Sequence, residues 1–122
     1  MATILLADDD KVLRDMYRLR LVGAGHVVYE ATDGAMVVDE AKKTHPDLIL
    51  LDVMMPKMNG LDVLKLLKSD KELQNIPVIV MTALSQDLSQ TDTISNDAVG
   101  FVSKSETMPD QLVAKVNQLV NR

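Results

Sequence analysis

The centre of the sequence reads Pro46-Asp47-Leu48-Ile49-Leu50-Leu51-Asp52-Val53-Met54-Met55-Pro56-Lys57-Met58-Asn59-Gly60. Four large aliphatic residues in succession, without polar alternation, predict a strand that is covered on both faces, as in the middle of a parallel sheet. Pro56 and the pair Asn59-Gly60 predict a turn before the next helix. Ligands of open parallel sheets bind beyond the carboxyl ends of the strands, which is where Asp52 stands. Taken alone, Asp52 is more simply explained as a cap of a loop or helix.

The size and composition of the chain predict one globular domain that spans residues 1–122. A chain of 122 residues buries roughly two-thirds of the surface that its unfolded form exposes, so it folds without disulfides or a structural metal. Eight Met and no Cys indicate an aliphatic core and exclude thiolate chemistry. The net charge of −5 argues against unaided binding to nucleic acid or anionic lipid. Because we find neither a basic leader nor a membrane-spanning apolar run, we expect a soluble cytoplasmic protein.

Short apolar runs alternate with segments of helical periodicity along the whole chain. The predicted strands are residues 4–7, 26–31, a run ending at residue 52, 78–81 and 100–103, and the predicted helices are residues 11–22, 34–45, a segment after residue 60, 85–97 and 107–120. The helix at 85–97 is predicted to be weak, because its Ser, Thr, Asp and Asn side chains compete for backbone hydrogen bonds. Right-handed crossovers between successive strands give an α/β fold with a parallel sheet. We expect a flavodoxin-like, doubly wound (βα)5 arrangement with strand order 2-1-3-4-5.

Polar side chains stand at the ends of four predicted strands. The order 2-1-3-4-5 brings them to one edge of the sheet, and they are Asp8, Asp9, Asp52, Thr82 and Lys104. Three carboxylates in one cleft repel one another, and a hard divalent cation such as Mg2+ relieves that repulsion. A carboxylate can also attack phosphorus to form an acyl phosphate, and Asp52, at the end of the central strand, is the best candidate nucleophile. Lys104, Thr82 and the ion would neutralise the phosphoryl oxygens.

Each of these residues also has a simpler structural interpretation. The acids at 8–10 can form a solvated turn before a helix, Thr82 can be one more strand-end hydroxyl, and Lys104 can be a surface lysine. The chemical interpretation therefore rests on the agreement between four strand ends, and on no single residue.

Over its entire length the sequence resembles the receiver domain of the two-component response-regulator family. The resemblance rests on Asp8-Asp9 after an apolar strand, the segment from Asp52 to Gly60, the pair Thr82-Ala83, and Lys104 after a strand that carries Phe101. It implies a phosphorylation-dependent signalling switch that has no enzymatic activity beyond its own phosphorylation and dephosphorylation. Asp52 would accept a phosphoryl group from a histidine kinase, a phosphotransfer protein or a small phosphodonor.

The resemblance also implies a metal site. Mg2+ would be held by Asp9, by Asp52 and by the backbone carbonyl of Met54, and Asp8 would contribute through a water molecule. The ion is therefore the cofactor that the resemblance predicts.

A second set of implied residues concerns the phosphoryl group. Thr82, Ala83 and Lys104 would bind it, the hydroxyl of Thr82 would move toward it, and the ring of Phe101 would turn inward. These movements would reshape the surface of the fourth helix, the fifth strand and the fifth helix. A downstream protein or an output domain would recognise that surface.

Some positions depart from the family pattern. Ser105 stands where Pro usually follows the lysine, and a cis peptide bond is much more costly before Ser than before Pro. Phe101 lacks the hydroxyl of the tyrosine that is common there, so an inward ring would be wholly apolar. Met54 and Leu84 are apolar where acidic or amide side chains orient an attacking water in other members. We therefore predict that the phosphorylated form is long-lived.

Three rival interpretations belong to other functional classes. A phosphohydrolase of the haloacid-dehalogenase type needs a second acid where this chain has Met54. An interaction module that works without phosphorylation would lack one of Asp9, Asp52, Thr82 or Lys104, and all four are present. A flavin-binding protein of this fold needs a phosphate-cradling loop in place of the acids after the first strand.

Overall fold

The computed structural model describes residues 2–53, 60–82, 98–104 and 108–120, with the backbone alone of Phe101. The strands are β1 (Thr3–Ala7), β2 (Val27–Ala31), β3 (Leu48–Asp52), β4 (Val78–Thr82) and β5 (Gly100–Ser103). The helices are α1 (Lys11–Gly23), α2 (Gly34–Thr44), α3 (Gly60–Ser69) and α5 (Pro109–Val120). All neighbouring strands are parallel, in the order β2-β1-β3-β4-β5. The predicted doubly wound fold is therefore confirmed.

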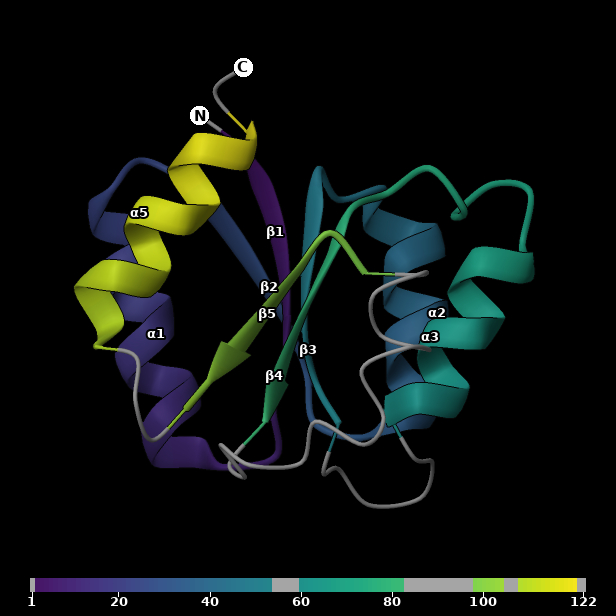
Figure 1. Cartoon of the computed structure of the whole chain (residues 1–122), viewed down its shortest axis with the longest axis horizontal. Helices are drawn as coiled ribbons and strands as arrows, with labels where there is room; N and C mark the ends of the chain where they lie inside the picture. Colours follow the sequence, from purple (N-terminus) through teal and green to yellow (C-terminus); the bar gives the residue numbers. More distant parts are fainter. Residues whose placement is uncertain (1, 54–59, 83–97, 105–107, 121–122) are drawn as a thin grey trace.

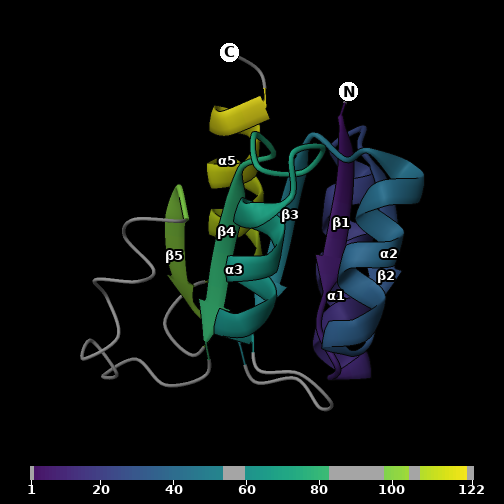
Figure 2. The same ribbon diagram turned by 90° about the vertical axis from the view of Figure 1, so that its right-hand side faces the viewer.

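The helices cover both faces of the sheet. Helices α1 and α5 lie on one side, and α2 and α3 lie on the other (Figure 1), which the perpendicular view also shows (Figure 2). Across the described residues, no helix combines the length and the apolar content needed to cross a bilayer.

The ends of the elements differ from the predicted ends by one or two residues. Helix α1 ends at Gly23, one residue beyond the predicted range of 11–22, and is capped by Ala24. Gly25 does adopt a left-handed backbone, with φ of 96°. Helix α5 begins at Pro109, two residues later than predicted. The predicted helix at residues 85–97 lies outside the described residues.

The sheet separates two apolar cores, because successive side chains of a strand point to opposite faces. All five residues of β3 and of β4 are buried, as the unbroken apolar runs predicted. Leu5, Ile49 and Leu51 pack with α2 and α3, whereas Ile4, Leu6, Leu48 and Leu50 pack with α1 and α5. Each fully buried aliphatic side chain stabilises the fold by about 1.5–3 kcal/mol, so the central strands are the most firmly held part of the sheet.

The pairing register aligns the carboxyl ends of the strands. Ala7 pairs with Leu51, Asp52 pairs with Met81, and Thr82 pairs with Ser103. The residue after each strand end therefore emerges at the same edge of the sheet. This edge contains the predicted site.

The start of α3 packs against the end of β3 at a glycine. The N–H of Gly60 donates to the carbonyl of Val53 at 3.1 Å. A Cβ atom at Gly60 would lie 2.3 Å from the Cα of Val53 and 2.9 Å from the carbonyl oxygen of Asp52. Among the described glycines only Gly25 has a positive φ, so Gly60 is required for close approach and not for a left-handed turn.

We predict that Gly60→Ala destabilises the protein by about 1–3 kcal/mol, because the new methyl group must displace backbone next to Asp52. Gly23→Ala is the matched control: nothing lies within 4 Å of its Cβ position, so it should be neutral or stabilising by up to about 1 kcal/mol. Urea unfolding of both variants provides the measurement. Equal stabilities for the two variants would show that Gly60 is not constrained by packing.

Candidate functional site

Three carboxylates form an acidic cluster at the carboxyl edge of the sheet. Asp8, Asp9 and Asp52 each offer an oxygen atom, and these atoms lie within 4.8 Å of one another. Asp8 and Asp52 are 0% and 1% exposed, whereas Asp9 is exposed. Asp8 and Asp9 follow β1 and Asp52 ends β3, and the pairing of these two strands brings the acids together.

Lys104 reaches this cluster from the end of β5. Its Nζ lies 2.8 Å from Oδ2 of Asp8 and 2.8 Å from Oδ2 of Asp52, and its side chain is only 8% exposed. The backbone N–H of Lys104 donates to the carbonyl of Thr82 at 2.7 Å. Lys104 is therefore a nearly buried counter-charge for two carboxylates, which excludes the simpler interpretation as a surface lysine.

Burial and charge act in opposite directions on these groups. Burial raises the pKa of Asp8, and the hydrogen bonds from Lys104 and from the N–H of Asp10 offset this only in part. For Lys104, burial alone lowers the pKa, but the two carboxylates outweigh it and the net pKa is raised. The stabilising charge of Lys104 is thus present below the ordinary lysine pKa and is lost only as the pH rises through the raised value.

Thr82 stands at the neighbouring strand end. It is buried at the end of β4, directly after Met81, which pairs with Asp52. Thr82 therefore stands at the carboxyl end of the strand next to β3, and its predicted role in the site remains a prediction. Met54, Ala83 and the side chain of Phe101 lie outside the described residues, so their predicted roles remain predictions.

Asp10 agrees with the simpler interpretation of the acids at 8–10 as a turn before a helix, whereas the contacts of Arg14 were not predicted from the sequence. The side chain of Asp10 caps α1 by accepting from the N–H groups of Val12 and Leu13. The side chain of Arg14 donates to the carbonyl of Asp8 and to the carboxylate of Glu30. The only feature of the sequence that relates to the contact between Arg14 and Glu30 is an isolated acid in the second strand, and such an acid does not identify its partner.

The acidic cluster suits a hard divalent cation. Its donor atoms are carboxylate oxygens, which Mg2+ prefers. Oδ2 of Asp8 is buried, and its contact within the described part of the chain is the ion pair with Lys104. The negative charge of three carboxylates exceeds the single positive charge of Lys104. These residues therefore fit a divalent cation.

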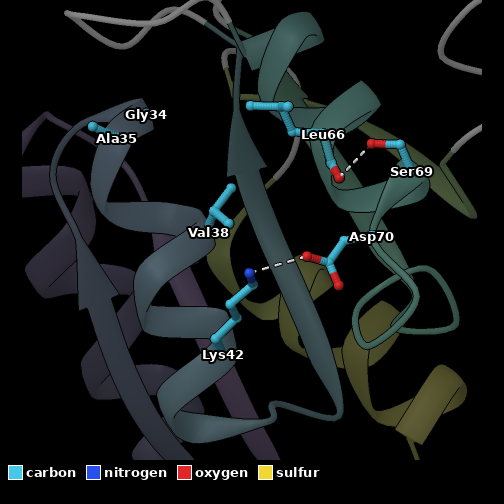
Figure 3. A pocket seen from close by; sticks show the side chains of 7 residues that line it. All are labelled: Gly34, Ala35, Val38, Lys42, Leu66, Ser69 and Asp70. Carbon is cyan, nitrogen blue, oxygen red and sulfur yellow. Dashed lines mark hydrogen bonds and ion pairs between the residues drawn. The ribbon is translucent and has the colours of Figure 1, made fainter.

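A separate hollow of about 450 Å³ lies between α2 and α3. Val38 and Leu66 face it, and an ion pair of 3.2 Å between Lys42 and Asp70 spans one end (Figure 3). Leu66 is 45% exposed here. None of the predicted site residues lines this hollow, so the carboxyl edge of the sheet remains the candidate site.

We predict that Lys104→Gln lowers the free energy of unfolding by about 3 kcal/mol at neutral pH without divalent ions, because it removes the cation that lies between two buried carboxylates. The deficit should shrink in acid, since protonation of Asp8 removes the repulsion. Lys42→Gln breaks a half-exposed ion pair and should cost about 0–1 kcal/mol. Urea unfolding between neutral pH and pH near 4 measures both; a pH-independent deficit for Lys104→Gln would contradict an electrostatic origin.

Known proteins share this sequence and this fold. Residues 4–117 match the response regulator receiver domain. The chain is 34% identical over 122 residues to the DNA-binding dual master transcriptional regulator RpaA of Synechocystis sp., covering all of this chain and 50% of RpaA. It is 30% identical over 107 residues to the polar-differentiation response regulator DivK of Brucella ovis, covering 88% of this chain and 87% of DivK.

A solved structure agrees with these matches. The receiver domain of Francisella response regulator 1452 superimposes with a TM-score of 0.88 at 28% identity, covering 100% of this chain and 98% of that one. The shared sheet order, the clustered acids and these similarities lead to one conclusion: the chain belongs to the receiver domain family of two-component response regulators.

Proposed function

We propose that residues 1–122 form one receiver domain that works as a phosphorylation-dependent switch, with Asp52 as the phosphoryl acceptor. The observation that carries this proposal is the placement of Lys104 Nζ, 2.8 Å from both Asp8 and Asp52, at the edge where the three acids meet. A buried nucleophile beside a fixed cation and a metal-binding set of acids suits phosphoryl transfer, which needs positioning and charge neutralisation.

In the proposed reaction, a carboxylate oxygen of Asp52 forms a bond to phosphorus while the bond between phosphorus and the donor breaks. The donor is the phosphohistidine of a histidine kinase, a phosphotransfer protein or a small phosphodonor such as acetyl phosphate. Asp9, Asp52 and the backbone carbonyl of Met54 would hold Mg2+, with Asp8 contributing through a water molecule, and the bound ion would supply positive charge for the phosphoryl oxygens. Lys104 supplies a second cation, and Thr82 supplies a hydroxyl donor and Ala83 a backbone N–H.

The phosphoryl group is proposed to change the surface around β5 and α5. Lys104 follows β5 directly, and its N–H is bonded to the carbonyl of Thr82, so movement of either residue reaches β5. Thr82 and Phe101 act as the switch pair in this proposal. The surface formed with residues 83–97 then controls a partner.

The partners follow from this mechanism. A sensor histidine kinase or a phosphotransfer protein supplies the phosphoryl group, and a downstream protein or an output domain receives the signal. The chain spans about half of RpaA but most of DivK, so the relatives include both arrangements. The net charge of −5 favours a protein target over direct contact with nucleic acid.

We predict that the chain gains one phosphoryl group when it is incubated with acetyl phosphate and Mg2+, and that Asp52→Asn gains none. Asp39→Asn, which removes an exposed carboxylate from α2, is the matched control and should be labelled like the wild type. Intact mass measured with and without a chelator reports both results. Labelling of Asp52→Asn, or continuous release of phosphate from an ester substrate, would reject the proposal in favour of another acceptor or a hydrolase.

We further predict that the lifetime of the phosphorylated form is much longer than seconds, because the apolar side chains of Met54 and Leu84 do not orient an attacking water molecule. Met54→Asn should speed the loss of phosphate by about tenfold or more, since an amide can position that water. Met36→Asn, at an exposed position of α2, should leave the rate unchanged. A radiolabel chase provides the rates, and wild-type loss within seconds would contradict this prediction.

A further inference from the structure

The side chain of Arg14 connects α1 to the ends of β1 and β2. Its Nη1 donates to the backbone carbonyl of Asp8 at 2.9 Å, and its Nε donates to Oε1 of Glu30 at 3.0 Å. The Arg14 side chain is 14% exposed, and Glu30 pairs with Leu6 in the β1–β2 register. The contact with Asp8 is made to its backbone and not to the carboxylates of the acidic cluster.

The carbonyl that Arg14 binds belongs to the peptide group between Asp8 and Asp9. A peptide group is planar, so fixing its carbonyl also fixes the direction in which the chain continues to Asp9. The N–H of Asp8 donates to the carbonyl of Ala31 at 3.1 Å, which holds the preceding peptide. Oδ1 of Asp8 accepts from the N–H of Asp10 at 2.9 Å. Arg14 therefore supplies the contact that orients the link between two of the three candidate metal ligands.

The carboxylate of Glu30 explains why the guanidinium of Arg14 is compatible with a nearby cation-binding cluster. A positive charge behind Asp8 would by itself oppose binding of a divalent ion. The carboxylate of Glu30, at 3.0 Å, offsets that charge while it fixes the guanidinium plane. The rigid fork of arginine donates from Nε and Nη1 at once, whereas the single ammonium of lysine does not reproduce this geometry.

We propose that Arg14 is a positioning residue, which sets the affinity of the acidic cluster for Mg2+ by fixing the Asp8–Asp9 peptide. The inference rests on the proposed function and extends it to a residue that contacts neither the ion nor the phosphoryl group. Residues that orient metal ligands from behind typically change metal affinity by about 10–100-fold when they are replaced. Charge and geometry predict opposite results here, because loss of a nearby positive charge alone would tighten Mg2+ binding.

The test is the dissociation constant of Mg2+, measured by calorimetry on the full chain without any phosphodonor. Arg14→Lys keeps the charge and removes the fork, and we expect binding weaker by about tenfold. Arg14→Met removes both and should weaken binding by about 10–100-fold. Arg18→Met, at an exposed position one turn further along α1, removes the same charge and should bind Mg2+ as tightly as the wild type or slightly more tightly.

Urea unfolding of each variant separates loss of folding from loss of positioning. If Arg14→Met does not fold, Arg14→Lys decides the question. Wild-type affinity in folded Arg14→Lys, or tighter binding in folded Arg14→Met, would overturn the proposal. If the wild type itself neither binds Mg2+ nor becomes phosphorylated, the proposed function fails and the inference fails with it. If the wild type does both and the Arg14 variants match it, only the inference fails.

Discussion

A single ammonium group balances two buried carboxylates at the edge of the sheet. Lys104 lies 2.8 Å from Asp8 and from Asp52, and both acids are almost fully buried. At a separation of about 4 Å and an effective dielectric constant of about 20, two like charges repel by about 4 kcal/mol. The ammonium relieves this repulsion, but with Asp9 the cluster keeps more negative than positive charge. The same arrangement is therefore stable enough to fold and still attractive to a divalent cation.

Much of this arrangement could be predicted from the sequence, because it follows from strand ends. The unbroken apolar runs at β3 and β4 specify strands that are covered on both faces, and the right-handed crossover rule leaves few ways to order five such strands. Once the order is known, residues that follow different strands must meet at one edge. Asp52 and Lys104 are 52 positions apart, and their contact was still predictable for this reason.

Other contacts could not be predicted from the order of the strands. His26 is 5% exposed; its Nδ1 accepts from the N–H of Ala2 at 3.2 Å, and its Nε2 lies 2.6 Å from Oδ1 of Asn117. These partners are 24 and 91 residues away, and nothing in the local pattern identifies them. The same is true of Arg14, whose helical position is compatible with solvent. The role of Gly60 in close packing likewise depends on where α3 meets β3. Such features arise from tertiary packing and not from local periodicity.

Asp8 has more polar contacts to the surrounding structure than Lys104 does. In the proposed switch, Lys104 would therefore be the residue that moves. Asp8 is bonded to Ala31, to Asp10 and to Arg14 as well as to Lys104, so it keeps three polar contacts if the ammonium moves. A phosphoryl group on Asp52 would replace the single negative charge of the carboxylate with about 1.5 to 2 negative charges on the phosphoryl oxygens, and it would draw that ammonium toward it. Because Lys104 follows β5 and precedes α5, its displacement would pass to these two elements, while the hydrogen bonds of Asp8 would keep the turn between β1 and α1 in place.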